Sequence, residues 1–381
     1  MSPNGKIYML TGMSFLVGTS QFALVGILAK VAASVGVSIA AAGQLITIFA
    51  LSNAVGTPLV IWATAKMDRR NQLLLALVLI LLGCGLIAGP GFGFLVGAYS
   101  VLGVGAGVFI VTAYSTAAYL ALPGRQGRAM ANVSLGFSAS LVFGVPLGRV
   151  VAAAYDWKVI FWVIGLGTLL SLFAVARAIP LTRVEVPVPL RKQLVLLKNP
   201  NIAMALGVTL FVFIAYSMMY TYITPFLTRV VSVGTGQISI VLLALGIASL
   251  IGSKLGGVLS DRIGTRRTLL GDLVAHGGVL ALVFLFAGTS VVAVPLLILW
   301  ATAAWTFGPT QNFNLLSLVP DAPGLALSLN SSFVQLGFAL GAAIGGIAIS
   351  SSTRAISGIG AVSVAVAFGI ACIAVSRART S

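Results

Sequence analysis

The fold of this chain is decided by the segment Gly252-Ser253-Lys254-Leu255-Gly256-Gly257-Val258-Leu259-Ser260-Asp261-Arg262-Ile263-Gly264-Thr265-Arg266-Arg267, because a partial copy of it occurs about half the chain earlier. In the two copies, Gly56, Leu59, Lys66, Arg70, Leu73 and Leu74 correspond to Gly252, Leu255, Arg262, Arg266, Leu269 and Leu270. The earlier copy is incomplete, since Ala65 takes the place of Asp261 and Asp68 that of Gly264. This duplication predicts that the chain consists of two related halves.

The composition predicts a protein that is embedded in a membrane. Hydrophobic residues make up 59% of the chain and charged residues 7%, whereas soluble domains carry about 25% charged residues. Most of the exterior must therefore face lipid. The 22 Lys and Arg against 6 Asp and Glu would suggest nucleic-acid binding in a soluble protein. Here they lie between apolar runs, so no nucleic-acid partner is expected.

Apolar runs long enough to cross a hydrocarbon core of about 30 Å predict twelve helices. We therefore expect an all-α membrane protein with twelve transmembrane helices in two pseudo-symmetric six-helix halves. The predicted helices cover residues 8–30, 40–64, 72–90, 94–121, 129–153, 158–176, 201–224, 237–258, 268–288, 292–316, 326–349 and 357–376. The predicted domains are an N-terminal half, 1–177, a Pro-rich and charged cytoplasmic linker, 178–200, and a C-terminal half, 201–381.

The basic residues in short loops predict the orientation, because they accumulate on the cytoplasmic side of a membrane. One side receives Lys6, Lys66, Arg69, Arg70, Arg125, Arg128, the basic residues from Arg177 to Lys198, Lys254, Arg262, Arg266, Arg267, Arg377 and Arg379. The other side receives Lys30, Arg149, Lys158, Arg229 and Arg354. Both termini are therefore predicted to be cytoplasmic, which agrees with an even number of spans.

Residues 252–267 resemble the loop signature of the major facilitator superfamily of transporters. Stretches typical of its twelve-span drug:proton antiporter branch are Gly18-Thr19-Ser20-Gln21-Phe22, Val37-Ser38-Ile39 leading to Ala42-Gly43-Gln44-Leu45, Gly136-Phe137-Ser138 followed by Gly144-Val145-Pro146-Leu147-Gly148, and Asp156-Trp157-Lys158 with Phe161. Within that branch the chain is most similar to the purine base and nucleoside efflux transporters and to their arabinose-exporter-like relatives. The closer match rests on Ala41-Ala42-Gly43-Gln44-Leu45-Ile46, Thr64-Ala65-Lys66-Met67-Asp68-Arg69, Trp305 with Pro309 and Gln311, and Asn330 with Gln335.

This resemblance, which covers nearly the whole chain, implies a secondary transporter of the bacterial inner membrane with the major facilitator fold. The expected function is export of a small planar or polar solute, a purine base or nucleoside first, by alternating access. The alternatives are a chloramphenicol-like multidrug exporter or a sugar exporter of the same branch, or a facilitator that is not coupled to an ion. From other classes, a pore and a receptor built on a transporter scaffold stay open.

No set of residues in the sequence suggests catalysis. The chain has one His, and neither paired carboxylates nor clustered Cys and His occur in it. We therefore expect no enzyme, no metal site and no cofactor. The expected partners are a small-molecule substrate, the lipid bilayer and, as a candidate, protons; the chain is expected to be a monomer.

Polar residues within the predicted spans are the candidates for substrate binding, because a polar side chain in a membrane is costly unless it faces a cavity or a partner. Amides and aromatic rings suit a flat heterocycle, since an amide matches the edge of a base and a ring stacks on its face. The alternative for each residue is that the amide bridges helices or the ring fills the core. The candidates are Gln21, Asn53, Ser138, Tyr216, Tyr220, Trp305, Gln311, Asn312, Asn330, Ser331 and Gln335. Of these, Gln21, Asn53, Trp305 and Gln335 are predicted to line one central site between the halves.

The two signature segments supply the candidates for gating. Asp261 is expected just past the end of the eighth span, where it accepts hydrogen bonds from Arg262, Arg266 or a helix end and forms a charged latch. Gly257 is expected to allow a close approach. The remaining gating candidates are Asp68, Arg69, Arg70 and Arg267; the alternative is a solvated turn. The latch of the first half should be weaker, because Ala65 accepts no bond.

Proton coupling has two candidate residues within a span, Asp272 and His276. They are four residues apart and therefore share a helix face, and an imidazole can exchange protons near neutral pH. Members of the resembled branch often carry an acid in the first span, where this chain has Gln21, and Gln does not titrate. The alternative for the pair is a structural bond between helices.

Overall fold

The computed structural model describes residues 2–122, 125–181, 196–234, 236–319 and 323–380. The chain divides into two compact units, Met1–Pro187 and Val188–Ser381, and each is described by itself. Every regular element in these described ranges is helical. Most of the predicted linker 178–200 lies outside the described residues; α8 ends at Ala178 and α10 begins at Pro200.

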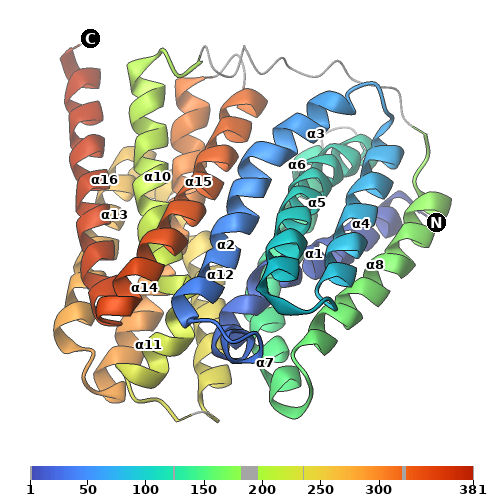
Figure 1. The fold of residues 1–381 in the computed structure, drawn as a ribbon. Coiled ribbons are helices and arrows are strands. Elements are labelled where there is room, and N and C mark those ends of the chain that lie inside the picture. Colours follow the sequence, from blue (N-terminus) through green and yellow to red (C-terminus); the bar gives the residue numbers. More distant parts are fainter. Residues whose placement is uncertain (1, 123–124, 182–195, 235, 320–322, 381) are drawn as a thin grey trace. The chain divides into compact units, whose positions relative to one another are not determined.

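The first unit is a bundle of helices, several of which are bent or interrupted (Figure 1). Its elements are α1 (Pro3–Ser34), α2 (Ile39–Leu51), α3 (Thr57–Ala63), α4 (Arg69–Leu86), α5 (Gly91–Leu120), α6 (Gln126–Ala139), α7 (Val145–Ala154) and α8 (Lys158–Ala178). The π-helical segment η1 (Ser52–Gly56) joins α2 to α3, and a second one, η2 (Ser140–Gly144), joins α6 to α7.

The second unit contains longer uninterrupted helices. Its elements are α10 (Pro200–Thr221), α11 (Ile223–Arg229), α12 (Ile238–Ile263), α13 (Thr265–Phe286), α14 (Ser290–Leu318), α15 (Pro323–Ser351) and α16 (Ala355–Thr380). α11 follows α10 after one residue, Tyr222.

Twelve helical stretches of the described chain are long and apolar enough to cross a membrane, which confirms the predicted number. The clearest boundary difference concerns the signature segment. The eighth span was expected to end at residue 258, but α12 continues to Ile263. Gly264, with a φ of 88°, then turns the chain directly into α13. Asp261 therefore lies in the last turn of a helix and not in a loop beyond it.

Proline explains both π-helical segments of the first unit. Pro58 and Pro146 stand at the second position of α3 and α7, directly after η1 and η2. Proline has no N–H, and its ring collides with the carbonyl four residues back. A wider π-type turn absorbs the collision; in η2 it is visible as the bond from the Val145 N–H to the Ser140 carbonyl, five residues back.

The two units repeat the same helix pairings, which supports their pseudo-symmetry. In the first unit α4 packs on α5 and α8, α1 on α6, and α2 on α5. In the second unit α13 packs on α14 and α16, α10 on α15, and α12 on α14. These are the corresponding spans in order along each half.

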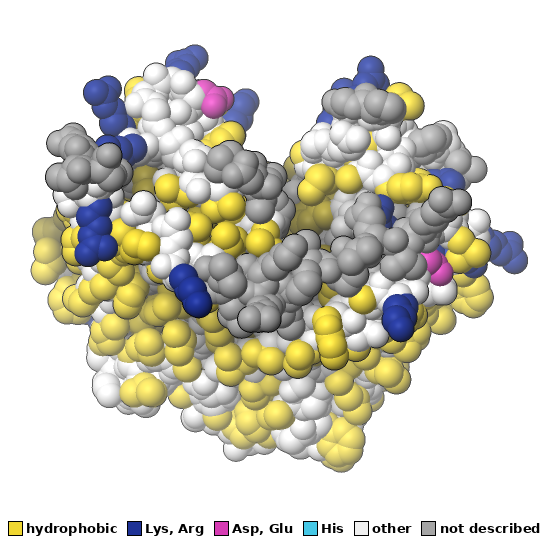
Figure 2. Space-filling view, turned by 90° about the horizontal axis from the view of Figure 1, so that it is seen from above, with side chains coloured by type: hydrophobic (Ala, Val, Ile, Leu, Met, Phe, Trp, Pro, Cys, Tyr) yellow, Lys and Arg dark blue, Asp and Glu magenta, His cyan; other side chains and the backbone are white. Residues whose placement is uncertain are grey.

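Basic side chains gather at one end of the second unit. Because successive spans alternate in direction, the start of α10, the end of α12, the start of α13 and the end of α16 lie at one end. These segments carry Lys198, Arg262, Arg266, Arg267 and Arg377. Figure 2 shows Lys and Arg side chains spread over the face that bears the C-terminus in Figure 1. The opposite end carries Arg229 and Arg354.

Small residues bring α12 and α14 into close contact. A Cβ atom added at Gly252 would overlap the carbonyl oxygen of Thr302, and one added at Gly256 would overlap that of Thr306. Thr306 Oγ1 donates to the Gly252 carbonyl at 3.1 Å. The spacing of four residues between the two glycines is the pattern that lets membrane helices approach closely. The expectation that Gly257 has this role is wrong within this unit, because a Cβ atom there would meet no atom within 4 Å.

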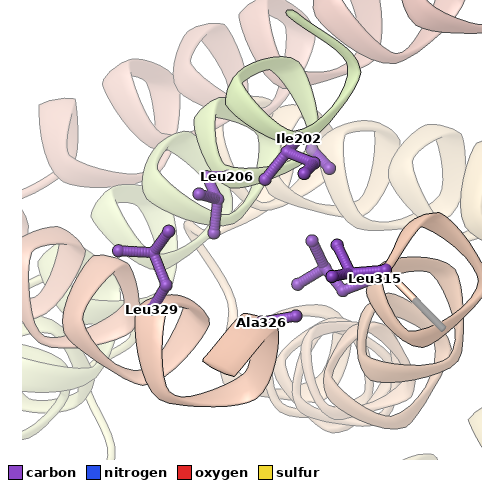
Figure 3. Close-up of a cluster of buried hydrophobic side chains, with 7 residues drawn as sticks. Ile202, Leu206, Leu315, Ala326 and Leu329 are labelled. Atoms are coloured by element: carbon purple, nitrogen blue, oxygen red, sulfur yellow. The ribbon is translucent and has the colours of Figure 1, made fainter. Parts of the chain in front are cut away.

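A cluster of buried apolar side chains lies where α10, α14 and α15 pack together. Its buried members are Ile202, Ala205, Leu206, Leu315, Val319, Ala326 and Leu329 (Figure 3). The cluster holds the beginning of α10 and α15 against the end of α14.

We predict that Gly256→Ala destabilises the protein by about 1–3 kcal/mol, because the added methyl group forces α12 away from α14. Gly257→Ala is the matched control, since the neighbouring position offers open space. The measurement is thermal unfolding of both purified variants in detergent. Equal melting temperatures of Gly256→Ala and Gly257→Ala would contradict the close contact described here.

Candidate functional site

Aromatic side chains form a continuous cluster between α10 and α14 in the second unit. Tyr216 stacks on Tyr220, with ring centroids 5.3 Å apart and an angle of 12° between the rings. Trp300 stacks on Tyr216 at 5.6 Å and 19°. Trp305 meets Tyr216 edge-on at 6.0 Å, and its Nε1–H donates to Tyr216 Oη at 3.1 Å.

The members of this cluster differ in exposure. Tyr216, Tyr220 and Trp300 are buried, whereas Trp305 is partly exposed. The Tyr216 hydroxyl accepts a hydrogen bond from the Trp305 indole and so fixes its orientation. Tyr216 is itself held by its stacking on the buried Tyr220. Trp305 is therefore the member of the cluster whose ring is accessible from outside it.

Gln335 on α15 has an amide oxygen that is buried and accepts no hydrogen bond from the described part of the chain. Phe338, one turn further along α15, lies 5.6 Å from the Tyr216 ring, so Gln335 belongs to the same region of the unit. Ser331, four residues before Gln335, is exposed and lies on the same helix face. The amide oxygen of Gln335 can therefore still accept a hydrogen bond on this face of α15.

The other amide candidates of the second unit bridge helices. Gln311 is fully buried, and its Nε2 donates to the Ala205 carbonyl at 2.6 Å and to Thr209 Oγ1 at 3.0 Å. Thr209 donates to Asn330 Oδ1 at 2.8 Å, and Asn330 donates in turn to Asn312 Oδ1 at 3.1 Å. This network ties α10, α14 and α15 together, which favours the structural alternative for these amides.

The candidates of the first unit lie on three different spans. Gln21 on α1 is buried, and no described residue forms a hydrogen bond with its side chain. Asn53 lies in η1 and accepts from Thr57 Oγ1 at 3.4 Å, beside Gly107 of α5. Ser138 on α6 is half-buried, two residues before η2. The prediction that Gln21 and Asn53 share one site with Trp305 and Gln335 stays a prediction.

The structure does not contain the expected latch around Asp261. Asp261 is exposed, and it forms neither an ion pair nor a hydrogen bond with Arg262, Arg266 or any other described side chain. Arg266 instead donates from its Nη2 to the Val375 carbonyl and joins the start of α13 to the end of α16. Arg262 and Arg267 are also exposed. In this arrangement the carboxylate is free to accept a bond.

The corresponding region of the first unit is fastened differently. Asp68 caps α4 by accepting from the Asn71 N–H at 3.1 Å and from Asn71 Nδ2 at 2.8 Å. Arg69 donates to the Ser115 carbonyl of α5 at 3.0 Å and lies over the Tyr119 ring. Arg70 is half-buried and its Nε has no partner in the described chain. The Asp at the start of a helix is a capping pattern that is legible in the sequence; the contact of Arg69 with α5 is not.

Asp272 and His276 both lie inside the second unit, on α13. His276 is fully buried, and its Nε2 accepts from the indole Nε1–H of Trp300 at 3.2 Å. The predicted bond between helices is thus present for His276, but no bond joins it to Asp272. Trp300 is not among the candidates predicted from the sequence, because nothing in the sequence indicates that its indole meets the imidazole of His276.

Among the residues that the structure describes, no group of three or more His, Cys, Asp or Glu side chains is close enough to hold a metal ion. This part of the chain presents the aromatic cluster and the amides. They offer ring faces, one indole edge and hydrogen-bonding groups of both kinds.

Residues 10–341 match the family model described as Major Facilitator Superfamily. The chain is 43% identical over 369 residues to the "Uncharacterized MFS-type transporter YbcL" of Bacillus subtilis (strain 168), covering 96% of this chain and 95% of that protein. Its fold is similar to crystal structures of a bacterial homologue of the human lysosomal transporter Spinster in an inward-facing conformation. The TM-score is 0.77 for the unoccupied form, at 17% identity over 98% of this chain and 96% of that one. It is 0.78 for the occupied form, at 16% identity over 98% and 97%.

Substituting Gln311 and Gln335 by leucine distinguishes an amide that bridges helices from one whose oxygen has no partner in the described chain. We expect Gln311→Leu to destabilise the protein by about 1–3 kcal/mol, because Thr209 and the Ala205 carbonyl lose a buried donor. Gln335→Leu is expected to leave stability nearly unchanged, since its amide oxygen has no protein partner to lose. Thermal unfolding of both variants in detergent checks this, and the opposite order of melting temperatures would reverse the two assignments.

Proposed function

Because the chain belongs to the major facilitator superfamily of transporters, we propose that it exports a small planar or polar solute, a purine base or nucleoside first, across the bacterial inner membrane. Transport proceeds by alternating access, in which two related halves rock around a solute. The multi-pass architecture of twelve apolar helices is in place for this. The basic end of the second unit is the cytoplasmic one under this proposal, and both termini are cytoplasmic.

The observation that carries the proposal is the pairing of a fixed aromatic ring with a free amide acceptor in one region of the second unit. Trp305 is partly exposed and held in place by Tyr216, and Gln335 Oε1 is buried without a donor. A purine supplies both complements, because its ring stacks on an indole and its N–H groups donate to an amide oxygen. Gln21 and Asn53 of the first unit would complete the site.

A sugar or multidrug exporter of the same superfamily is the second candidate. A sugar also offers hydroxyl donors to Gln335, but it lacks the flat conjugated face that stacks on Trp305. A bulky drug would be bound chiefly by the rings and would depend little on the amide. The relative importance of Trp305 and Gln335 therefore discriminates between the candidates.

Asp261 is proposed to act on the conformational equilibrium and not on the solute. In the structure it is exposed and unpaired at the end of α12, while Arg266 fastens the neighbouring helix start to α16. A bond that forms in only one arrangement of the bundle shifts the population toward that arrangement. Under this proposal, the latch forms only in a conformation in which Asp261 accepts a hydrogen bond.

The first test is ligand-induced stabilisation of the purified protein. Hypoxanthine at about 100 times its dissociation constant should stabilise the wild type by about 2.7 kcal/mol, by mass action. Arabinose and chloramphenicol at the same concentrations should not. The shift should be lost in Trp305→Ala and Gln335→Leu and kept in Gln311→Leu, whose amide bridges helices. Stabilisation by chloramphenicol or arabinose alone would replace the purine with the second candidate.

The second test concerns Asp261. Asp261→Asn should slow counterflow of radiolabelled hypoxanthine in proteoliposomes by about tenfold and leave its dissociation constant within about twofold, because the carboxylate biases a conformational equilibrium. Asp156→Asn, in the exposed loop between α7 and α8, is the matched control and should change neither quantity. Weaker binding with unchanged turnover would place Asp261 in the solute site.

A further inference from the structure

Asp272 is a buried carboxylic acid in the membrane-spanning part of the second unit. Its side chain is 6% exposed, and it lies about 10 Å along α13 from the first residue of the helix, at 1.5 Å per residue. Its Oδ2 is buried without a hydrogen-bond partner, and no described residue forms an ion pair with it. Among the acids of the described spans it is the buried one, since Asp261 is exposed at a helix end.

His276 lies on the same face of α13, four residues further along. It is fully buried near the middle of Thr265–Phe286. Its Nε2 accepts from Trp300, while its Nδ1 has no partner in the described chain. The face therefore carries two unsatisfied groups that can hold a proton, one on each of two successive turns.

Among the described side chains, no neighbouring charge neutralises this face. α13 packs on α12, α14 and α16. The charged or titratable residues of these helices are Lys254, Asp261 and Arg262 on α12 and Cys372, Arg377 and Arg379 on α16, while α14 has none. On α13 itself they are Arg266 and Arg267, at the first turn. The side chain of Arg379 lies outside the described residues; none of the others forms an ion pair with Asp272 or a hydrogen bond with His276. An ionised carboxylate that is buried in this way is costly, so the group must gain a positive partner.

A proton fits the site better than a metal cation does. A hard cation such as Ca²⁺ or Mg²⁺ takes about six or more oxygen ligands, whereas this face offers one carboxylate and one imidazole. The carbonyls of α13 are engaged in an unbroken helix from Thr265 to Phe286. A proton needs only the one oxygen of Asp272 that has no partner.

The pair is connected to the aromatic cluster by two direct contacts. Trp300 donates to His276 with its indole nitrogen and stacks on Tyr216 with its ring face. Tyr216 in turn holds Trp305 through its hydroxyl. A change of charge or hydrogen bonding at His276 therefore acts on the ring that positions Trp305.

We propose that Asp272, with His276 as its neighbour on the same face, is the proton-coupling site of this transporter, and that Trp300 links it to the aromatic cluster. The proposal rests on the proposed transport function. Proton binding forms an O–H bond at Asp272 Oδ2 and removes the negative charge of the carboxylate. Release breaks that bond and returns the proton to water on the other side of the membrane. Coupling then resides in the second unit, without an acid in the first span.

An infrared titration tests the proton site without any solute. Protein reconstituted in vesicles is recorded over a pH series, and the expected result is a carboxyl C=O band that appears and disappears with pH. Asp272→Asn should remove this band, and Asp156→Asn, an exposed acid, should leave it in place. Replacing sodium by choline should not alter it. The absence of a band that depends on Asp272, or its dependence on sodium, overturns the proposal.

Transport measurements test the coupling and separate it from the transport function itself. Radiolabelled hypoxanthine is the probe. In Asp272→Asn, its accumulation under an imposed pH gradient should fall at least about tenfold, which lies within the usual range of coupling free energies. The rate of hypoxanthine counterflow, which needs no gradient, should stay within about twofold of the wild-type rate. Asp272→Glu, which retains a carboxyl group, should restore part of the accumulation. Accumulation that survives Asp272→Asn and His276→Ala together overturns the proposal. If hypoxanthine is not transported at all, the purine assignment fails, and the infrared result alone decides the proton site.

Discussion

Every polar group in the spanning helices must find its partner inside its own bundle, because hydrocarbon offers none. Most buried hydroxyls of the described chain obey this rule by donating to carbonyls of their own helix or of a neighbouring one, as Ser217 does to the Phe338 carbonyl at 2.7 Å. In the described part of the second unit, the buried side-chain atoms that break the rule are Gln335 Oε1, Asp272 Oδ2 and His276 Nδ1. The described part of the first unit has three such atoms as well, Arg70 Nε, Tyr99 Oη and Thr112 Oγ1. Those of the second unit differ in that two of them, on Asp272 and His276, belong to groups that can gain or lose a proton and share one face of α13.

The two halves solve one packing problem with different residues. The contact of α12 with α14 depends on Gly252 and Gly256, both on α12. The corresponding contact of α2 with α5 depends on Gly103 and Gly107, both on α5, which receive the backbone of Phe49 and the side chains of η1 and α3. Gly56, the counterpart of Gly252, also lies close to α5, since a Cβ atom added there would overlap the side chain of Val104. The halves therefore share this contact, but Leu299 and Ala303 stand where the first half has Gly103 and Gly107.

The twelve helices could be predicted from the sequence because the hydropathy of a span is a sum over its residues. Each span is an apolar run, and hydropathy summed over about 20 residues tolerates local error. The site was less predictable, because the role of an amide depends on its direction. Gln311 and Gln335 are the same residue type at similar depth, yet one is saturated by Thr209 and the Ala205 carbonyl and the other is not. To predict which of Gly256 and Gly257 faces α14, one must likewise know how α12 is rotated about its own axis. Neighbouring residues of a helix point in directions about 100° apart.

Trp300 connects His276 of α13 to the aromatic cluster of α10 and α14. Its indole nitrogen can donate to only one acceptor, and it donates to His276. A second proton on that imidazole removes the acceptor, so the indole loses its bond and the stack on Tyr216 loses a fixed edge. The same Tyr216 hydroxyl orients Trp305. In the proposed mechanism, the rings of Trp300 and Tyr216 thus separate protonation at His276 from solute contact at Trp305, and this short path lies wholly within the helices α10, α13 and α14 of one unit.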